Sequence, residues 1–254
     1  MRTLLGLTAI LLVTGCLCAQ QIPSGTLLPT MLDNTVDSEH SKPGEEISTK
    51  LMQDVPLPDG GKIKRGAKVL GHVVSVAAAS TGQPTKIVVQ FDRIEIDKHE
   101  VSIATSLRAL ASMQAVATAK QPVNANSGNG TSVWDWNMIQ VGGQGVFNGQ
   151  SIVKSQTGEV VGKVPEPGAV LAVPMPNPSR GCAGASVNTA EQAFWVFSTD
   201  ACGVYGYKHL ALDRSAGDTS PGQITLQSSK NITIRGGSGW LLQVVSAPAA
   251  SSGQ

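Results

Sequence analysis

Four short segments of the chain share one pattern of apolar and polar positions. In each, an apolar residue is followed three or four residues later by a glycine, and an apolar run begins two or three residues after that glycine. Because glycine adopts a positive φ without a Cβ penalty, the pattern predicts a tight turn or bulge that leads into a strand. The other interpretation is coincidence in a chain rich in glycine and valine. The expected turn glycines are Gly25, Gly66, Gly71, Gly168 and Gly237.

Alternation between these segments predicts further strands. Residues 85–96 begin as a continuous apolar run and end in alternation, which is typical of a strand that passes from full to half burial. Residues 101–104 continue the alternation, so Asp97 and Lys98 are expected in a hairpin turn. Residues 106–119 contain good helix formers and predict a short helix. Residues 222–228 and 230–236 are expected to form a last hairpin.

These elements predict a mostly β protein, either a β-barrel or a β-sandwich, with a short peripheral helix and flexible loops. The stretch 120–132 is rich in Asn, Ser and Gly and is expected to be a flexible linker or loop. It separates a first half, 20–119, from a second half, 133–246. The two halves either fold separately or, as we favour, complete one barrel or sandwich. Residues 247–254 are expected to form a disordered tail.

The composition agrees with this fold class and reduces the number of possible functions. Charged residues make up 15% of the 254 residues, against about 25% in an average soluble protein. The 28 glycines and 14 prolines supply the turns that many short strands need. A formal net charge of +1 predicts neither nucleic-acid binding nor electrostatic attraction to an anionic membrane surface.

Residues 1–19 have the pattern of a secretory signal peptide. Arg2 precedes an apolar run from Leu4 to Val13, which is far shorter than the roughly 20 residues that span a bilayer. Two endings fit equally well. The residues up to Cys16 resemble a lipobox, in which a leader of residues 1–15 is removed and Cys16 is lipidated. Alternatively, ordinary cleavage takes place near Cys18 or Ala19. Either ending predicts export, to the periplasm, the outer membrane or the extracellular space.

Two cysteines, Cys182 and Cys202, lie outside this leader. In an oxidising compartment such a pair predicts a disulfide, and the less favoured interpretation is two buried free thiols. Closing a loop of about 20 residues would stabilise the fold by roughly 3 kcal/mol. No His or second Cys lies at ligand spacing beside either cysteine, so we expect no metal site there.

Three motifs follow one another in the first hundred residues, and a fourth closes the chain. The matching residues are Ile22, Gly25, Thr26, Leu28 and Pro29; Ile63, Gly66, Leu70 and Gly71, with Lys64 and Ala67 in place of the usual Pro and Ser; Val89, Phe91, Arg93 and Ile94; and residues 230–245. In this order they resemble the C-terminal domain of the TrbI-like conjugal-transfer protein family, the channel-forming component of type IV secretion machines. The resemblance covers a minor part of the chain and implies a β-barrel with a peripheral helix.

The chain departs from that family in two respects. The family has an inner-membrane helix and a Pro-rich arm before its barrel, whereas here the leader runs almost directly into the first barrel motif. The family also carries an apolar two-helix antenna, whereas residues 111–150 are polar and rich in Gly and Asn. A channel role therefore does not carry over. What the resemblance implies is an exported barrel that docks on another molecule.

The sequence contains no pattern typical of a catalytic, cofactor or metal site. Its histidines stand far apart without paired ligand spacing, and Ser238 lies in a Gly-rich turn rather than in a nucleophile elbow. Trp134 and Trp136 are the exception that suggests a binding role. Alternate residues of a strand share one face, so the two could form a platform for a sugar ring or an anchor for a partner. The alternative, which we favour, is that both rings cover the core.

The sequence thus predicts a non-enzymatic structural or interaction module of the cell envelope, without a cofactor. The alternative function is a glycan- or cell-wall-binding module that uses Trp134 and Trp136. The expected partners are envelope proteins or glycan, and contact with a membrane is expected only through a lipid on Cys16. The oligomeric state is left open.

Overall fold

The computed structural model describes residues 22–120, 136–148, 152–154, 159–166, 168–175, 190–213 and 222–245. Within them the protein is mostly β, with twenty strands and one short helix. The elements in chain order are β1 Leu27–Leu32, β2 Val36–Asp37, β3 Glu46–Leu51, β4 Val55–Pro56, β5 Lys62–Ile63, β6 Lys68–Ala77, β7 Thr85–Ile96, β8 His99–Ser102, β9 Ala104–Ala111, α1 Met113–Ala119, β10 Trp136–Gln140, β11 Gly143–Asn148, β12 Ile152–Lys154, β13 Val160–Lys163, β14 Leu171–Ala172, β15 Gln192–Ala193, β16 Gly203–Tyr205, β17 Leu210–Asp213, β18 Gln223–Ser228, β19 Thr233–Ile234 and β20 Gly239–Val245.

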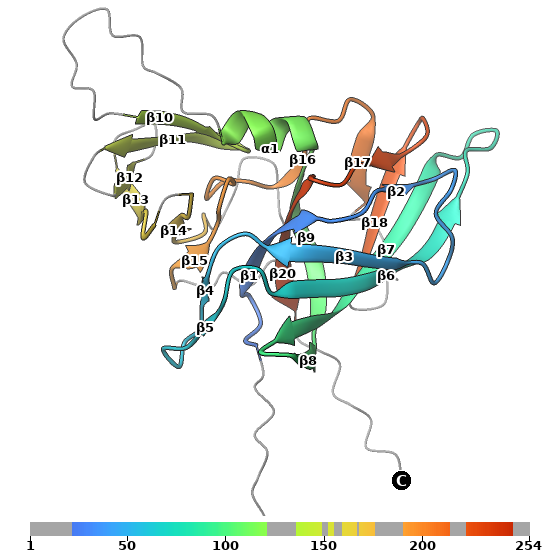
Figure 1. Ribbon diagram of the computed structural model, residues 1–254. Helices are drawn as coiled ribbons and strands as arrows, with labels where there is room; N and C mark the ends of the chain where they lie inside the picture. The colour runs from blue at the N-terminus through green and yellow to red at the C-terminus, as the bar shows by residue number, and fades with distance from the viewer. Residues whose placement is uncertain are drawn as a thin grey trace, which may run out of the picture.

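Ten strands form one strongly curved sheet that makes a nearly closed barrel (Figure 1). Its order is β16-β9-β20-β1-β3-β6-β7-β18-β17, with β8 paired to β7. The two ends of this order, β16 and β17, are consecutive strands joined by residues 206–209. Strands from before and after residues 120–132 therefore share one sheet. The prediction of a β-barrel with a short helix is confirmed.

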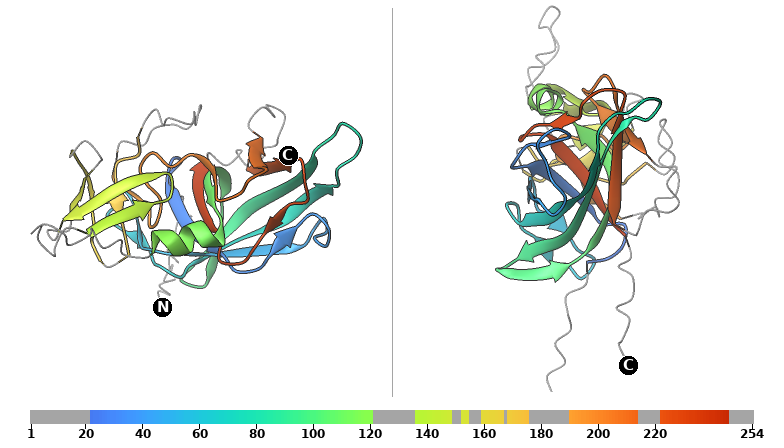
Figure 2. Two further views of the ribbon diagram at one scale, coloured as in Figure 1. Left: turned by 90° about the horizontal axis from the view of Figure 1, so that it is seen from above. Right: turned by 90° about the vertical axis from the view of Figure 1, so that its right-hand side faces the viewer.

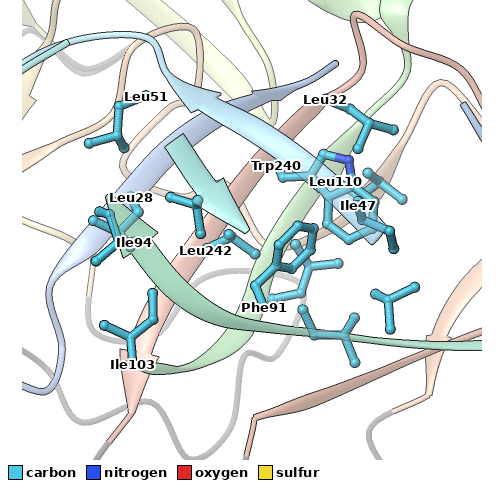
Figure 3. Packing of buried hydrophobic residues seen from close by; sticks show 14 of the residues in the cluster. Leu28, Leu32, Ile47, Leu51, Phe91, Ile94, Ile103, Leu110, Trp240 and Leu242 are labelled. Carbon is cyan, nitrogen blue, oxygen red and sulfur yellow. The ribbon is translucent and has the colours of Figure 1, made fainter. Parts of the chain in front are cut away.

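Side chains fill the interior of the barrel (Figure 3). Phe91 of β7 and Trp240 of β20 are fully buried, and their rings meet edge to face with centroids 5.4 Å apart. Such a pair adds about 0.5–1.5 kcal/mol to the stability gained from burial alone. Leu28 of β1, Ile94 of β7 and Leu242 of β20 belong to the same buried cluster. The interior is a packed core rather than a channel.

The glycine turns expected from the sequence are present at four of the five positions. Gly25, Gly66, Gly168 and Gly237 have φ values of +88°, +89°, +80° and +86°, and each precedes a strand, respectively β1, β6, β14 and β20. Gly71 is different because it lies inside β6, where the register with β7 shifts. A Cβ there would lie 2.0 Å from the carbonyl oxygen of Gln90. Gly71 therefore permits a close approach of two strands and is not a turn residue.

The structure also tests the expected hairpins and helix. Asp97 and Lys98 form the β7–β8 turn, as predicted, with φ values of +48° and +69°. The expected last hairpin is wrong, because β18 pairs with β7 and β17 while β19 pairs with β2. The helix is shorter than predicted. Residues up to Ala111 belong to β9, and the helix begins at Met113 after Ser112, whose hydroxyl caps it.

A second sheet lies beside the barrel (Figures 1 and 2). Strands β10 to β15 form it in simple sequential, antiparallel order. With α1 and the residues up to Cys202, this sheet forms an insertion between β9 and β16, which are themselves paired in parallel. We call the described residues between 112 and 202 the insertion. Residues 1–21, 121–132 and 247–254, which include most of the expected leader, linker and tail, lie outside the described residues.

Candidate functional site

The insertion packs on the outer face of the barrel and forms a second apolar core there. Leu27 of β1, Leu241 of β20 and Ala109 of β9 point out of the barrel into this core. From the insertion come the fully buried rings of Phe194 and Phe197, with smaller side chains around them. Each of the three barrel strands is consequently covered on both faces.

A buried glutamine of the barrel fixes the insertion in place. Gln53 lies just after β3 and is 1% exposed. Its Nε2 donates to the carbonyl oxygen of Val170 (2.9 Å), and its Oε1 accepts from the backbone N–H groups of Val170 (3.0 Å) and Trp195 (2.6 Å). The side-chain amide thus makes with Val170 the same pair of hydrogen bonds that the backbone of a neighbouring strand would make. Trp195 has a φ of +50°, which is unfavourable for a bulky residue, and this hydrogen bond helps to hold it.

Two further polar side chains connect the barrel and the insertion. Gln192 Oε1 accepts from the backbone N–H of Leu27 (3.0 Å). Arg108 of β9 is buried, and its Nη2 donates to the carbonyl oxygens of Met175 (3.3 Å) and Thr199 (3.2 Å). Because buried backbone groups must be hydrogen-bonded, these contacts set one specific position for the insertion.

A groove of about 360 Å³ lies where the helix meets the rest of the protein. It runs between α1, the end of β10 and the end of β16, and all of its lining residues are uncharged. They are Ser112, Gln114, Ala115, Thr118, Ala119, Gln140, Val141, Gly142, Tyr205 and Gly206. The lining therefore combines hydroxyl and amide groups with small apolar side chains.

The walls of the groove are held by short contacts. The Tyr205 hydroxyl accepts from the backbone N–H of Cys202 and donates to its carbonyl oxygen, both at 2.9 Å. Gln140 Nε2 donates to the carbonyl oxygen of Phe197 (3.0 Å). A Cβ on Gly206 would lie 2.2 Å from Ser112 Oγ, so only glycine allows this turn to approach the helix so closely. The groove is thus built from fixed backbone, with Gln114 and Thr118 exposed along the helix.

Only some of the residues singled out in the sequence lie within the described part of the chain. Cys202 is fully buried and disulfide-bonded. Cys182, Cys16 and Trp134 lie outside the described residues, so the pairing of Cys182 with Cys202 stays a prediction. Trp136 begins β10, four residues before Gln140 of the groove, but its side chain is not among those described.

Sequence reasoning missed the residues that position the insertion and the groove. Gln53, Arg108 and Gln140 look like ordinary polar residues in the sequence. The partners of Gln53 lie 117 and 142 positions away along the chain, so no local pattern marks them. The local sequence is equally uninformative. Gln53 and Asp54 stand between the apolar residues Met52 and Val55, and two adjacent polar residues are usually interpreted as an exposed turn.

Among the described residues, no group of three His, Cys, Asp or Glu side chains could hold a metal ion. Tyr207 comes directly after Gly206 of the groove, and burial raises the pKa of its hydroxyl. A hydrogen bond with Ser238 (3.0 Å) offsets part of this rise in pKa. In the same described segments, no helix has both the length and the apolar character needed to cross a bilayer.

No protein-family model matches the chain, and the search of curated proteins found no match.

We predict that Gln53→Met lowers the melting temperature by about 5–15 °C. The buried N–H groups of Val170 and Trp195 would lose their acceptor, at about 1–3 kcal/mol each, and about 2–4 °C of melting temperature corresponds to 1 kcal/mol in a protein of this size. Thermal unfolding followed by circular dichroism measures the change. Gln83→Met, at an exposed position on the β6–β7 turn, is the control and should melt as the wild type does. Equal melting of all three proteins would contradict the role given to Gln53.

Proposed function

We propose that the protein is a non-enzymatic interaction module of the bacterial cell envelope, whose partner binds in the groove between α1, β10 and β16. The observation that carries this proposal is where the protein has room for a bound molecule. The barrel interior is filled by apolar side chains, whereas the groove of about 360 Å³ is open at the surface and has a fixed backbone. A preformed hollow of this size with an uncharged lining suits a protein segment or a small polar molecule.

The resemblance to the TrbI-like barrel supports the same function. It implies an exported barrel that docks on other molecules, and the insertion provides a surface for docking that lies outside the motifs of that resemblance. The insertion is held rigidly by Gln53, Gln192 and Arg108. A partner would therefore meet a preformed surface and would pay little ordering entropy on binding.

A glycan is the second candidate for this groove. Its lining offers hydroxyl and amide groups from Ser112, Gln114, Thr118 and Gln140, which can donate to and accept from sugar hydroxyls. Gln140 ends the strand that begins at Trp136, and Trp134 precedes it in sequence. Aromatic rings next to uncharged hydrogen-bonding groups are the combination that binds sugars. The interaction module is the wider proposal, and the glycan is one form of its partner.

Export belongs to this proposal as well. Residues 1–19 supply the leader, and either cleavage near Ala19 or lipidation of Cys16 places the barrel outside the cytoplasm. The buried, disulfide-bonded state of Cys202 supports an oxidising compartment, with Cys182 as the proposed partner.

We predict that the intact mass of the protein purified from its host lacks the leader. Lipidation predicts a chain that begins at Cys16 and carries a diacyl- or triacylglyceryl group, and ordinary cleavage predicts an unmodified chain that begins near Ala19. Alkylation of the denatured protein without reduction should leave Cys182 and Cys202 unlabelled, and prior reduction should make both reactive. A mass that still includes residues 1–15 would contradict export, and labelling of both cysteines without reduction would contradict the disulfide.

We predict that Thr118→Arg abolishes partner binding without loss of stability. Thr118 is exposed and lines the groove, so a long charged side chain there would fill it. Ala117→Arg is the matched control, because Ala117 is an exposed neighbour on the same helix that does not line the groove. Cross-linking in the native envelope tests a protein partner, and sedimentation with purified cell-wall glycan tests a sugar. Binding that survives Thr118→Arg, or that both variants lose equally, would contradict the groove as the binding site.

A further inference from the structure

Strand β6 extends past the end of one of its two neighbours. On one side it pairs with β7 as far as its last residue, Ala77. On the other side its pairing with β3 ends at His72, after which Val73 makes two more hydrogen bonds, to residues 44–45. Residues 74–77 therefore have a neighbouring strand on one side only. Within the described part of the chain, no backbone hydrogen bond reaches their other edge.

Two local features separate β6 from β3 at this point. The register between β6 and β7 shifts between Val73 and Ser75, and such a bulge bends a strand and increases its twist. The chain that leads into β3 makes a turn, in which Gly44 has a φ of +84° and the N–H of Glu45 donates to the carbonyl oxygen of Lys42 (3.0 Å). The β6–β7 hairpin consequently projects beyond the rest of the barrel (Figure 2).

Other strand edges of the same sheet are covered or charged. Beyond its pairing with β1, the edge of β3 is closed by Asn34, whose Nδ2 donates to the carbonyl oxygen of Glu46 (3.2 Å) and whose Oδ1 accepts from the N–H of Ser48 (3.2 Å). Strand β8, which pairs with β7, carries the exposed side chains of His99 and Glu100. Covers and charged side chains are the usual means by which proteins prevent strand edges from pairing with other chains.

The free edge of β6 has neither form of protection. Residues 73–85 contain no charged residue. Ser75 and Ala77 are exposed, as are residues 78–83. Alternate residues of a strand direct their N–H and C=O groups to the same edge. Backbone donors and acceptors of residues 74–77 are therefore open to a further strand, and no charged side chain stands in its way.

The charge pattern of this edge suits a second copy of the same chain. A two-fold axis at Val76 would bring two β6 strands together in antiparallel orientation, with Ser75 of one copy opposite Ala77 of the other. Like charges directly opposite each other destabilise a strand pair, so an edge pairs with itself most easily where it is uncharged. The pairing also has a defined length, because residues 44–45 already occupy the edge of Val73 in both copies.

We propose that the protein forms a symmetric dimer in which two β6 strands pair in antiparallel orientation, centred on Val76. Each copy contributes the same edge, so the contact is closed by the two-fold axis and stops at two copies. The two barrel sheets become continuous across the interface. None of the residues that line the groove beside α1 belongs to β6. The dimer thus carries two grooves, and this inference does not depend on the function proposed for them.

The first test is the oligomeric state of the purified protein. Because the contact consists of one short strand pair, it belongs with the small interfaces, and we expect a dissociation constant of about 10–1,000 µM. Sedimentation equilibrium should show a monomer that passes into a dimer across this range of concentration. A protein that stays monomeric up to about 1 mM, or that forms larger species instead of a dimer, would overturn the proposal.

An exchange of charge then locates the contact. Ser75→Lys together with Ala77→Lys should weaken dimerisation at least about tenfold, since each introduced positive charge would face another across the two-fold axis. Ser75→Glu together with Ala77→Glu should weaken it similarly through negative charges. An equimolar mixture of the two double variants should dimerise again, because opposite charges then face each other. Restored dimerisation would also show that both variants are folded.

The matched control combines Ser102→Lys and Ala211→Lys. These are exposed positions of β8 and β17, in the same sheet but away from the β6 edge, and they change the net charge equally. The control should dimerise as the wild type does. Pairing through β6 would be refuted by any of three results: undiminished dimerisation of the first lysine variant, equal loss in the control, or a mixture that stays monomeric.

Discussion

The strands β9, β20 and β1 are buried on both faces, and the rest of the structure depends on that double burial. Their inner face holds Trp240 and Leu242 in the barrel core, and their outer face presents Leu27 and Leu241 to the insertion. Leaving a leucine exposed instead of buried costs about 1.5–3 kcal/mol, so a barrel without its insertion would lose much of its stability. The insertion is therefore part of the fold, and its packing on the barrel also holds the groove at its edge.

Local features of the fold could be predicted from the sequence, and contacts between distant segments could not. Gly25 and Gly237 were identified as turns because a positive φ is a local property, and Asp97–Lys98 for the same reason. The end of β9 was predicted as helix, since a strand buried on both faces is apolar at consecutive positions and shows no alternation. The pairing of β18 with β7, more than a hundred residues away, left no signal at all in a single sequence.

The same division applies to the candidate sites. The sequence points to Cys202 and to the strand of Trp136, both of which lie near the groove, but it gives no indication of Gln53, whose partners are distant in the chain. Net charge was similarly uninformative about surfaces. A value of +1 averages over residues 33–46, which contain five acidic residues, and residues 62–68, which contain four basic residues. The fold brings the two segments together, since Lys50 is opposite Lys68 in the sheet and forms an ion pair with Asp33. Charge pattern becomes evidence about partners only after the fold has placed it.

The docked position of the insertion is the central claim, because the groove exists only if the insertion is held against the barrel. Hydrogen exchange of three backbone amides tests it most directly. Leu27 N–H donates to Gln192, and Val170 and Trp195 N–H donate to Gln53, so all three bonds exist only in the docked state. We expect these amides to exchange orders of magnitude more slowly than unstructured peptide, as closed structure requires. Exchange of Val170 and Trp195 at the rate of unstructured peptide, while barrel amides such as that of Val89 stay protected, would show that the insertion is not docked.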